Sequence, residues 1–327
     1  MKVAIIGVGE ISKLHINALI QAGEQIVALC DIIPSKCELA NKEFSLNAKI
    51  YADYKKMLAD EDIDAVHICT PHYLHAEMVI NALNKNVNIL CEKPLAISLT
   101  ELDEIEVAVK NSTAILGVCQ QNRYNDASRF AKTYFSDKKI TSAYGSLIWK
   151  RDADYYNSGI WRGKKATEGG GVMINQALHT LDMLQWITGM PISVVATTNN
   201  HALKNVIDVE DTAFGIFKID DERNFVVTAT NSAKYSFPIV LGFASENDVM
   251  QITMDNVILN GNFYVKKDGT SVIGKEVWGT GHVKLIKDFY NKLSKGEKFP
   301  IDFYEASKVV KLILALYSSN GNEIFIK

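Results

Sequence analysis

The sequence has few of the features that mark secreted or metal-binding proteins. Only five of its 327 residues are cysteine, the number is odd, and no two of them form a Cys-x-x-Cys pair. Four of the five end apolar runs, so we expect small buried hydrophobic residues rather than disulfides or metal ligands. This pattern of cysteines predicts that the protein resides in a reducing compartment, the cytoplasm. It also predicts that the protein has no metal site.

Long apolar runs and charge of one sign are also scarce. No window reaches the roughly 18 apolar residues that a membrane helix needs. The first ten residues, MKVAIIGVGE, contain two glycines and an acid, which is a poor pattern for a secretory signal. Lysine and arginine number 35 against 38 acidic residues, which leaves a net charge of −3 without a basic stretch. We therefore expect neither a membrane nor a nucleic acid as a partner.

An alternation of strand and helix patterns fills the first 120 residues. Continuous apolar runs, such as residues 2–7 and 65–70, are typical of parallel strands that are covered on both faces. Segments with helical spacing, such as residues 11–22 and 73–84, separate these runs. The alternation predicts an α/β fold that begins with a Rossmann doubly wound parallel sheet over residues 1–120.

The pattern changes after residue 120. A strong helix is predicted over residues 171–189, and β-type runs follow from residue 194 to 259 without helices between them. Two helices close the chain, at residues 282–293 and 303–318. Consecutive strands predict a C-terminal α/β domain, residues 121–327, with a large open, mostly antiparallel sheet.

A glycine turn between the first strand and the first helix predicts a dinucleotide site. Gly7 permits the tight turn, and Gly9 lets the backbone approach a pyrophosphate at the helix start, which Glu10 and Ile11 begin. Ser12 replaces the third glycine of the fingerprint and is still small enough for close helix–strand packing.

Asp31 ends the second strand, about 20 residues after the turn, where the hydroxyls of the adenosine ribose would lie. Its carboxylate favours NAD over NADP, because an anion repels a 2′-phosphate. Lys36 is near in sequence and is the one cation that weakens this argument.

Residues after the fourth strand are expected to border the same crevice. Thr70 and Pro71 form the turn there, and His75 follows at the start of a helix. His75 either contacts cofactor or substrate, or is a histidine packed in the corner of the fold. The sequence favours neither interpretation.

Six ordered motifs then agree with a known family. They are the turn at 7–12, Thr70-Pro71 with His75, Glu92-Lys93-Pro94, Gln121-Asn122-Arg123-Tyr124, Trp161-Arg162-Gly163, and Glu168-Gly169-Gly170-Gly171 followed by His179 and Asp182. This set resembles the glucose–fructose oxidoreductase and inositol dehydrogenase family (Gfo/Idh/MocA). The resemblance implies a Rossmann domain and a C-terminal domain whose open sheet builds a homodimer or homotetramer. It also implies sugars or similar polyols as substrates.

The resemblance assigns roles to individual residues. Lys93 is expected beside the nicotinamide and the reacting hydroxyl, and His179 is expected to act as the acid/base. Glu92 and Gln121 are expected to border the cofactor. The expected substrate-binding residues are Lys93, Arg123, Tyr124, Trp161, Arg162, Asn175 and His179.

One position departs from the family pattern. Many members carry D-x-G-x-H, whereas here the segment reads Asn175-Gln176-Ala177-Leu178-His179. An amide at residue 175 can bind a hydroxyl but cannot exchange a proton at neutral pH. On one helix, Asn175, His179 and Asp182 would share a face. Asp182 would then either orient His179 or satisfy a backbone group. The run Gly169–Gly171 is expected to pass close to cofactor or substrate.

These residues predict an NAD-dependent dehydrogenase that acts on CH–OH groups of a sugar, glycoside or cyclic polyol. Lys93 can stabilise a developing alkoxide, and His179 has a suitable pKa for a base, but which of them takes the proton stays open. Two alternatives remain. One is an enzyme that retains NAD and cleaves glycosides by oxidation and elimination. The other is a dinucleotide-sensing regulator without catalysis.

Overall fold

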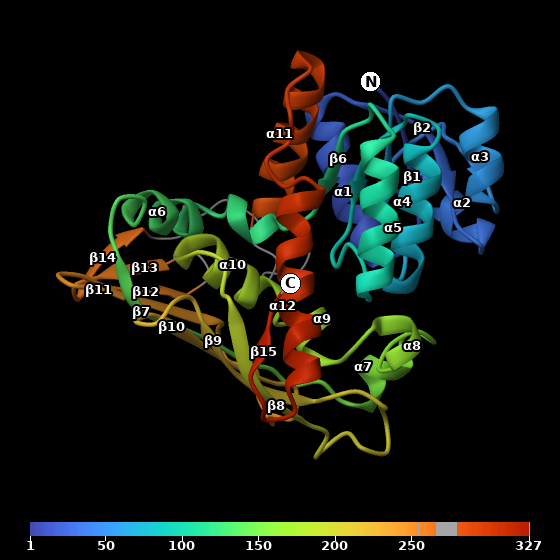
Figure 1. Cartoon of the computed structure of the whole chain (residues 1–327). Helices are drawn as coiled ribbons and strands as arrows, with labels where there is room; N and C mark the ends of the chain where they lie inside the picture. Colours follow the sequence, from blue (N-terminus) through green and yellow to red (C-terminus); the bar gives the residue numbers. More distant parts are fainter. Residues whose placement is uncertain (254–255, 266–279, 327) are drawn as a thin grey trace. The chain divides into compact units, whose positions relative to one another are not determined.

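The computed structural model describes residues 1–253, 256–265 and 280–326, which form two compact units (Figure 1). The first unit combines Met1–Gln121 with Thr280–Ser307, and the second combines Asn122–Gly279 with Lys308–Lys327. The segment Thr280–Ser307 therefore groups with the N-terminal unit, although the sequence pattern placed it in the C-terminal domain. The reason is packing, because α11 (Gly281–Lys295) lies against α1 (Glu10–Ala22).

A six-stranded parallel sheet forms the centre of the first unit. Its strands are β1 (Lys2–Ile6), β2 (Gln25–Cys30), β3 (Lys49–Tyr51), β4 (Ala65–Ile68), β5 (Asn88–Cys91) and β6 (Leu116–Val118). They lie in the order β3-β2-β1-β4-β5-β6, and all neighbours are parallel. The chain changes direction between β1 and β4, where a doubly wound sheet opens a crevice at its carboxyl edge. The predicted Rossmann fold is confirmed.

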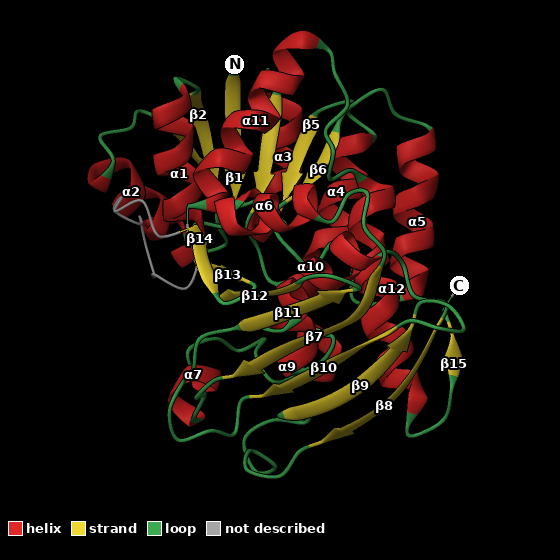
Figure 2. Cartoon of the chain, turned by 90° about the vertical axis from the view of Figure 1, so that its left-hand side faces the viewer, coloured by secondary structure: helices red, strands yellow, loops and turns green. Residues whose placement is uncertain are grey.

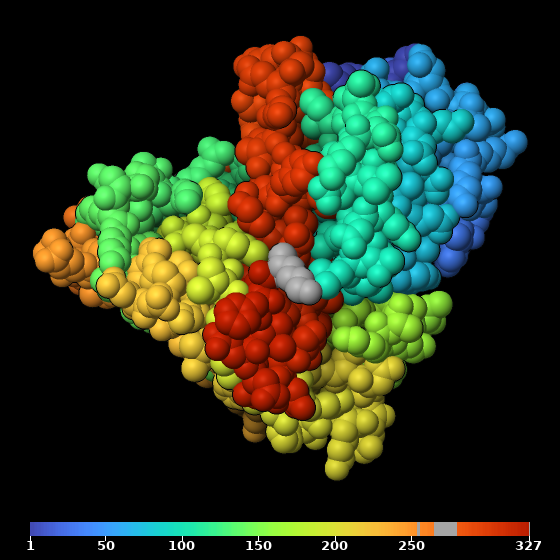
Figure 3. Space-filling view, viewed as in Figure 1, coloured from blue at the N-terminus to red at the C-terminus, as the bar shows by residue number. Residues whose placement is uncertain are grey.

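Helices with one apolar face pack against this sheet and against each other. They are α1, α2 (Pro34–Glu43), α3 (Tyr54–Asp60), α4 (His75–Leu83), α5 (Leu99–Lys110) and α11, with short 3₁₀ turns η1 (His72–Leu74) and η2 (Gln121–Tyr124). Helix α5 begins where the hydroxyl of Ser98 accepts a hydrogen bond from the amide of Glu101. It buries Leu102, Ile105 and Ala108 at a spacing of three, while its other face lies on the surface (Figure 3).

A nine-stranded sheet forms the second unit. Its strands are β7 (Ile140–Ile148), β8 (Ser193–Asn199), β9 (Thr212–Lys218), β10 (Asn224–Thr230), β11 (Val240–Ser245), β12 (Val249–Thr253), β13 (Asn256–Leu259), β14 (Asn262–Val265) and β15 (Ile324–Phe325). Their order is β14-β13-β12-β11-β7-β10-β9-β8-β15. Only β7 and β10 pair in parallel, so the predicted open, mostly antiparallel sheet is confirmed.

Helices cover one face of this sheet. Contacts to its strands come from α6 (Asp126–Tyr134), α9 (Val172–Asn175) and α10 (Leu178–Thr188). The unit also contains α7 (Ala153–Asn157), α8 (Lys165–Glu168) and most of α12 (Phe303–Ser319). No described helix of this unit covers the other face (Figure 2). Along β9 and β10 buried residues alternate with exposed ones, as a sheet with one open face requires.

The helix predicted over residues 171–189 is interrupted. It divides into α9 and α10, with Gln176 and Ala177 between them. Ala177 donates its amide hydrogen to the carbonyl of Val172 five residues back, which breaks the regular pattern. The periodicity of the apolar residues continues across the break, so the sequence gives no sign of it.

All five cysteines are buried, as expected of small hydrophobic residues. Within the described residues, no helix combines the length and the apolar character that crossing a membrane requires.

Candidate functional site

Gly7 and Gly9 shape the turn between β1 and α1 in different ways. Gly7 has a φ of +87°, and a Cβ there would lie 2.7 Å from the carbonyl oxygen of Cys69, so the fold itself requires glycine. A Cβ on Gly9 would meet nothing within 4 Å. In the described structure no side chain caps the amides that follow Gly9 at the start of α1. The open approach and the uncapped amides fit a pyrophosphate at this helix end.

Ser12 takes over the packing role of the third glycine. It is fully buried, and its hydroxyl donates to the carbonyl oxygen of Gly9 at 2.6 Å. Glu10 is exposed and Ile11 is half-buried in the first turn of the helix. The replacement therefore keeps the turn closed against the sheet.

Asp31 is tied to the glycine turn through both carboxylate oxygens. Oδ2 accepts from the amide of Val8 at 2.9 Å, and Oδ1 accepts from the amide of Ile33 at 2.9 Å. The ammonium of Lys36 lies 3.6 Å from Oδ1. The carboxylate is thus fixed at the position where a ribose hydroxyl would lie, with one cation beside it.

His75 holds two turns of the first unit together. Its Nδ1 lies 2.7 Å from the carbonyl oxygen of Pro94, and its Nε2 lies 2.8 Å from the carbonyl oxygen of Thr70. Burial lowers the pKa of His75, while the two carbonyl partners raise it. The residue is fully buried with both ring nitrogens occupied, which favours the packed-corner interpretation. Thr70 and Pro71 themselves are half-buried at this edge.

Glu92 and Lys93 directly follow β5 at the same carboxyl edge. Glu92 is buried, whereas Lys93 is half-buried, and the backbone amide of Lys93 donates to Glu92 Oε2 at 3.2 Å. The edge therefore places an acid in the interior and a lysine toward the surface. Gln121, another predicted cofactor neighbour, is buried at the end of the segment that follows β6.

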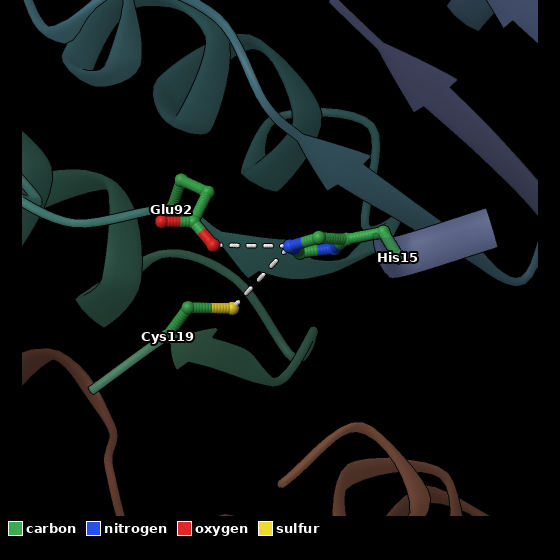
Figure 4. A group of neighbouring side chains, drawn as sticks. All are labelled: His15, Glu92 and Cys119. Atoms are coloured by element: carbon green, nitrogen blue, oxygen red, sulfur yellow. Dashed lines mark hydrogen bonds and ion pairs between the residues drawn. The ribbon is translucent and has the colours of Figure 1, made fainter. Parts of the chain in front are cut away.

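A buried polar cluster surrounds the Glu92 carboxylate. His15 Nε2 lies 3.0 Å from Glu92 Oε1 and 3.9 Å from the sulfur of Cys119 (Figure 4). His282 Nε2 lies 3.4 Å from the same Glu92 oxygen. Among the described residues, His15, Glu92 and Cys119 are the one group with three ligand atoms within 4.8 Å of each other. No local sequence pattern indicates this cluster, because its members come from α1, α11 and the ends of two strands.

Asn175 and His179 lie on either side of the break between α9 and α10. They are the two residues between Gly171 and Thr180 that are not fully buried, so both have atoms at the surface. The amide of Asn175 donates to the carboxylate of Glu168, which is itself buried. This bond fixes the orientation of the amide.

Tyr155 links Asn175 to the predicted substrate residue Arg162. The hydroxyl of Tyr155 lies 2.7 Å from Arg162 Nη1 and 3.4 Å from Asn175 Nδ2, and both nitrogens donate to it. Arg162 also lies over the rings of Tyr155 and Trp161, 4.6 Å from each centroid. The structure thus brings Trp161, Arg162 and Asn175 into one connected group, with Tyr155 as a member that the predicted set did not include.

Arg123 and Tyr124, two predicted substrate-binding residues, are both buried. The guanidinium of Arg123 forms a two-pronged pair with Asp182, at 2.8 Å from Nε to Oδ2 and 2.6 Å from Nη2 to Oδ1. Both side chains of the pair are almost fully buried. Tyr124 is buried, and Arg129 lies 4.6 Å above its ring. Asp182 is therefore a partner of Arg123, a role that neither interpretation of the sequence included.

The glycines at 170 and 171 serve packing within the second unit. A Cβ on Gly170 would lie 2.1 Å from the hydroxyl of Tyr317, and one on Gly171 would lie 1.8 Å from the carbonyl oxygen of Glu210. The close approach that we expected toward a ligand is an approach to α12 and to the start of β9. Packing therefore explains both glycines without a cofactor.

Two family models match the chain. Residues 1–120 match the model described as "Oxidoreductase family, NAD-binding Rossmann fold", and residues 139–247 match the "GFO/IDH/MocA C-terminal domain". The first match agrees with the predicted cofactor, NAD.

Three relatives show how far the similarity extends. Levoglucosan dehydrogenase of Pseudarthrobacter phenanthrenivorans is 33% identical over 321 residues, which cover 84% of this chain and 82% of that protein. The crystal structure of myo-inositol 2-dehydrogenase from Lactobacillus plantarum is 25% identical with a TM-score of 0.84, and it covers 100% of this chain and 99% of its own. The WlbA dehydrogenase of Bordetella pertussis, in complex with NADH and UDP-GlcNAcA, shares the fold at 24% identity and a TM-score of 0.86, over 100% of this chain and 98% of its own.

Proposed function

The chain belongs to the GFO/IDH/MocA family of NAD-binding oxidoreductases, and we propose from this that it moves a hydride between NAD and a secondary alcohol of a sugar, glycoside or cyclic polyol. The observation that carries the proposal is the carboxyl edge of the first sheet. There the open glycine turn, the fixed Asp31 carboxylate and the half-buried Lys93 follow three strands of one Rossmann sheet. We assign cofactor binding to residues 1–120 and substrate binding to residues 121–327.

Each unit supplies one reactive side chain in this proposal. NAD supplies the hydride acceptor or donor when it is bound. The ammonium of Lys93 binds the reacting oxygen and stabilises the negative charge that develops on it. The imidazole of His179 completes the acid/base pair, and one of these two groups takes the hydroxyl proton.

The second unit supplies groups that suit a sugar. Trp161 offers an aromatic face for the apolar side of a sugar ring, and Arg162 offers donors for its hydroxyls. Asn175 binds a hydroxyl without exchanging its proton. The relatives named for levoglucosan and myo-inositol support a cyclic polyhydroxy substrate for this chain.

Absorbance at 340 nm tests the proposed reaction. We expect NADH to accumulate when the protein is mixed with NAD⁺ and a panel that contains levoglucosan, myo-inositol and free hexoses. Cleavage of a glycoside without net NADH would instead support the oxidation–elimination alternative. Tight NAD binding without turnover of any sugar or glycoside would support the sensing alternative and contradict the proposal.

The open face of the second sheet supports an oligomer. Large apolar or aromatic side chains are exposed across four neighbouring strands, β7, β10, β9 and β8, namely Tyr144, Val195, Phe214, Ile216 and Val226. An exposed apolar face of this kind is typical of a protein–protein interface. We propose a homodimer or homotetramer through this face, and light scattering should give a mass of two or four times 36.4 kDa. A monomer at micromolar concentration would contradict it.

The free, buried cysteines support a reducing compartment, and we propose the cytoplasm. Fractionation of cells that express the tagged full chain tests this, and recovery of the protein outside the cytoplasmic fraction would contradict it.

A further inference from the structure

A chain of buried polar side chains leads to Glu92 within the first unit. The hydroxyl of Tyr290 on α11 lies 2.8 Å from His67 Nε2 on β4. His67 Nδ1 lies 2.7 Å from His15 Nδ1 on α1, and His15 Nε2 lies 3.0 Å from Glu92 Oε1. All four side chains are buried, the two histidines completely. An interface between helices and a parallel sheet is normally apolar, so this series of buried polar side chains needs an explanation.

The proton positions follow from the Tyr290 end. Burial raises the pKa of Tyr290 well above its ordinary value, so the phenol keeps its proton. Among the described residues, His67 Nε2 is the one hydrogen-bond partner of that hydroxyl. A buried O–H group is costly without an acceptor, so Tyr290 donates and His67 Nε2 accepts.

The remaining directions are then determined. Burial lowers the pKa of His67 well below its ordinary value, so its ring is neutral and carries one N–H group. With Nε2 accepting, Nδ1 of His67 donates to His15 Nδ1. His15 therefore accepts at Nδ1 and donates from Nε2 to Glu92 Oε1, as a second neutral ring. Each hydrogen bond in the series Tyr290–His67–His15–Glu92 is thus donated in the direction of the Glu92 carboxylate.

Glu92 is accordingly a carboxylate whose chain of donors carries no positive charge. Burial alone would raise the pKa of Glu92, but hydrogen bonding to His15 and His282 lowers it well below its ordinary value. Burial shifts the pKa of the other titratable groups around it toward their neutral forms. Burial lowers the pKa of His282 and His75, and it raises the pKa of the thiols of Cys69, Cys91 and Cys119.

Lys93 is the cation of the same edge. Its ammonium lies close enough to contribute, after burial, to the lowered pKa of both His282 and His75. An oxidised nicotinamide brings a second positive charge to this edge, whereas the reduced ring is neutral. The Glu92 carboxylate offsets that charge, and the offset works only while no histidine of the cluster becomes a cation.

We propose that Tyr290, His67 and His15 are positioning residues that hold Glu92 as a carboxylate bonded to a neutral imidazole donor, which favours binding of NAD⁺ over NADH at the neighbouring edge. The proposal rests on the proposed function, because it places the nicotinamide beside Lys93. It adds a role for a cluster that the hydride-transfer mechanism itself does not use.

Nitrogen NMR of the full chain labelled with ¹⁵N-histidine tests the proton positions. At pH 7 we expect His15 to carry its proton on Nε2 and His67 to carry its proton on Nδ1. Assignment uses His15→Gln and His67→Gln, each of which removes one ring. A doubly protonated His15, or the reverse arrangement of protons, would overturn the proposal.

Metal analysis of the purified chain, with titration of zinc chloride, tests the competing use of the cluster. A zinc ion held by His15, Glu92 and Cys119 would take the lone pair of His15 Nε2 and force its proton onto Nδ1. We expect no bound metal and no change in the His15 signals with one equivalent of zinc. Stoichiometric zinc with shifted His15 signals would overturn the proposal.

Cofactor affinity tests the consequence for binding. In Glu92→Gln we expect the Kd for NAD⁺ to rise about tenfold more than the Kd for NADH, as measured by calorimetry. Glu77→Gln, which changes an exposed acid on α4, is the matched control and should leave the ratio unchanged. Equal weakening of both cofactors, or no change in the ratio, would overturn the proposal.

Tyr290→Phe is a second test variant. It removes one oxygen, the hydroxyl at the end of the hydrogen-bonded series that lies opposite Glu92. Without that hydroxyl, His67 is free to reverse its proton, and His15 is free to become an imidazolium that neutralises Glu92. We expect a protonated His15 and a smaller shift of the affinity ratio in the same direction, while Tyr54→Phe shows neither. An unchanged proton pattern in Tyr290→Phe would contradict the proposal.

The affinity ratio also separates this inference from the proposed function. It requires no sugar, so a chain that oxidises no polyol but shows the shifted ratio would contradict only the proposed function. A wild-type chain that binds neither cofactor would contradict both.

Discussion

Both units contain a buried glutamate, and the two carboxyl groups are held in opposite ways. Glu92 in the first unit has histidine partners, and its pKa is lowered despite burial. Glu210 in the second unit accepts from the amides of Gly171 and Met173 at 2.8 and 3.0 Å and from the hydroxyl of Tyr317 at 2.8 Å. Burial raises the pKa of Glu210, although these bonds lower it.

The difference shows that burial alone does not decide what a carboxyl group does. Glu92 is bonded to histidine side chains, so the proton positions of these partners determine how its charge is balanced. Glu210 is bonded mainly to fixed backbone amides at the start of α9, so it acts as a clamp on the helix that leads to Asn175. Glu92 thus contributes charge at the edge of the first sheet, whereas Glu210 fixes the position of α9.

The largest effect should come from removing the proposed reactive group of each unit. We expect Lys93→Ala and His179→Ala each to lower kcat by about 100-fold or more, the usual scale for acid/base groups, with NAD affinity changed by only a few-fold. Steady-state kinetics and calorimetry measure both. Lys110→Ala and His201→Ala, at exposed positions, are the controls. Normal turnover in either active-site variant would show that its unit does not supply a reactive group.

A carboxylate introduced beside Glu168 should destabilise the fold of the second unit. Asn175→Asp replaces the amide that donates to Glu168 by a like charge. We expect a loss of about 2 kcal/mol in unfolding free energy at pH 7, because a partly buried hydrogen bond becomes a repulsion. Urea unfolding measures the loss, which should shrink at acidic pH as one carboxyl group takes a proton. Asn175→Ala separates the lost bond from the added charge, and equal stability of both variants would contradict the repulsion.

The cofactor preference of the first unit should depend on Asp31. We expect Asp31→Ala to reduce the preference for NAD over NADP by about tenfold, because the anion that repels the 2′-phosphate is gone while Lys36 remains. Fluorescence titration with the two reduced cofactors gives the ratio. Asp62→Ala, which removes an exposed acid, should leave it unchanged. An unchanged ratio in Asp31→Ala would mean that the carboxylate has only a structural role at the turn.

The smallest effects should appear in the pH dependence of stability, with opposite signs for the two glutamates. The folded pKa of Glu92 is below its ordinary value of 4.5, so its contribution is present above that value and is lost as the pH falls. The folded pKa of Glu210 is above 4.5, so its contribution is present below that value and is lost as the pH rises.

Unfolding titrations from about pH 4 to pH 7 measure the two contributions separately. The stability of the wild type relative to Glu92→Gln should increase over this range, and its stability relative to Glu210→Gln should decrease. Parallel trends would mean that the two carboxyl groups are held alike, which would remove the contrast between the units.

Local signals were enough to predict the cofactor edge. Gly7, Gly9 and Asp31 are separated by one strand and one helix, and their spacing alone places them at one end of a parallel sheet. Lys93 follows a strand of the same sheet, so its position at the carboxyl edge was predictable too. The similarity of the motifs to a known family added the assignment of His179.

Features that depend on contacts distant in sequence were not predictable. The Arg123–Asp182 pair joins residues 59 positions apart, and each residue alone matches a surface or site residue equally well. His15, His67 and His282 each occur singly within an apolar pattern, where one histidine gives no sign of a cluster. The grouping of α11 with the first unit also depends on packing that no local pattern encodes.

The parallel pairing of β7 with β10 has a consequence for how the proposed substrate residues become ordered. Ser142 pairs with Asn224 and Ile148 pairs with Thr230, so the pairing closes a loop of about 75 residues. Trp161, Arg162, Asn175 and His179 all lie inside that loop. We therefore expect this segment to reach its final order only after the centre of the sheet has joined. Amide protons of this segment should gain protection from solvent exchange late in refolding, together with those of β10.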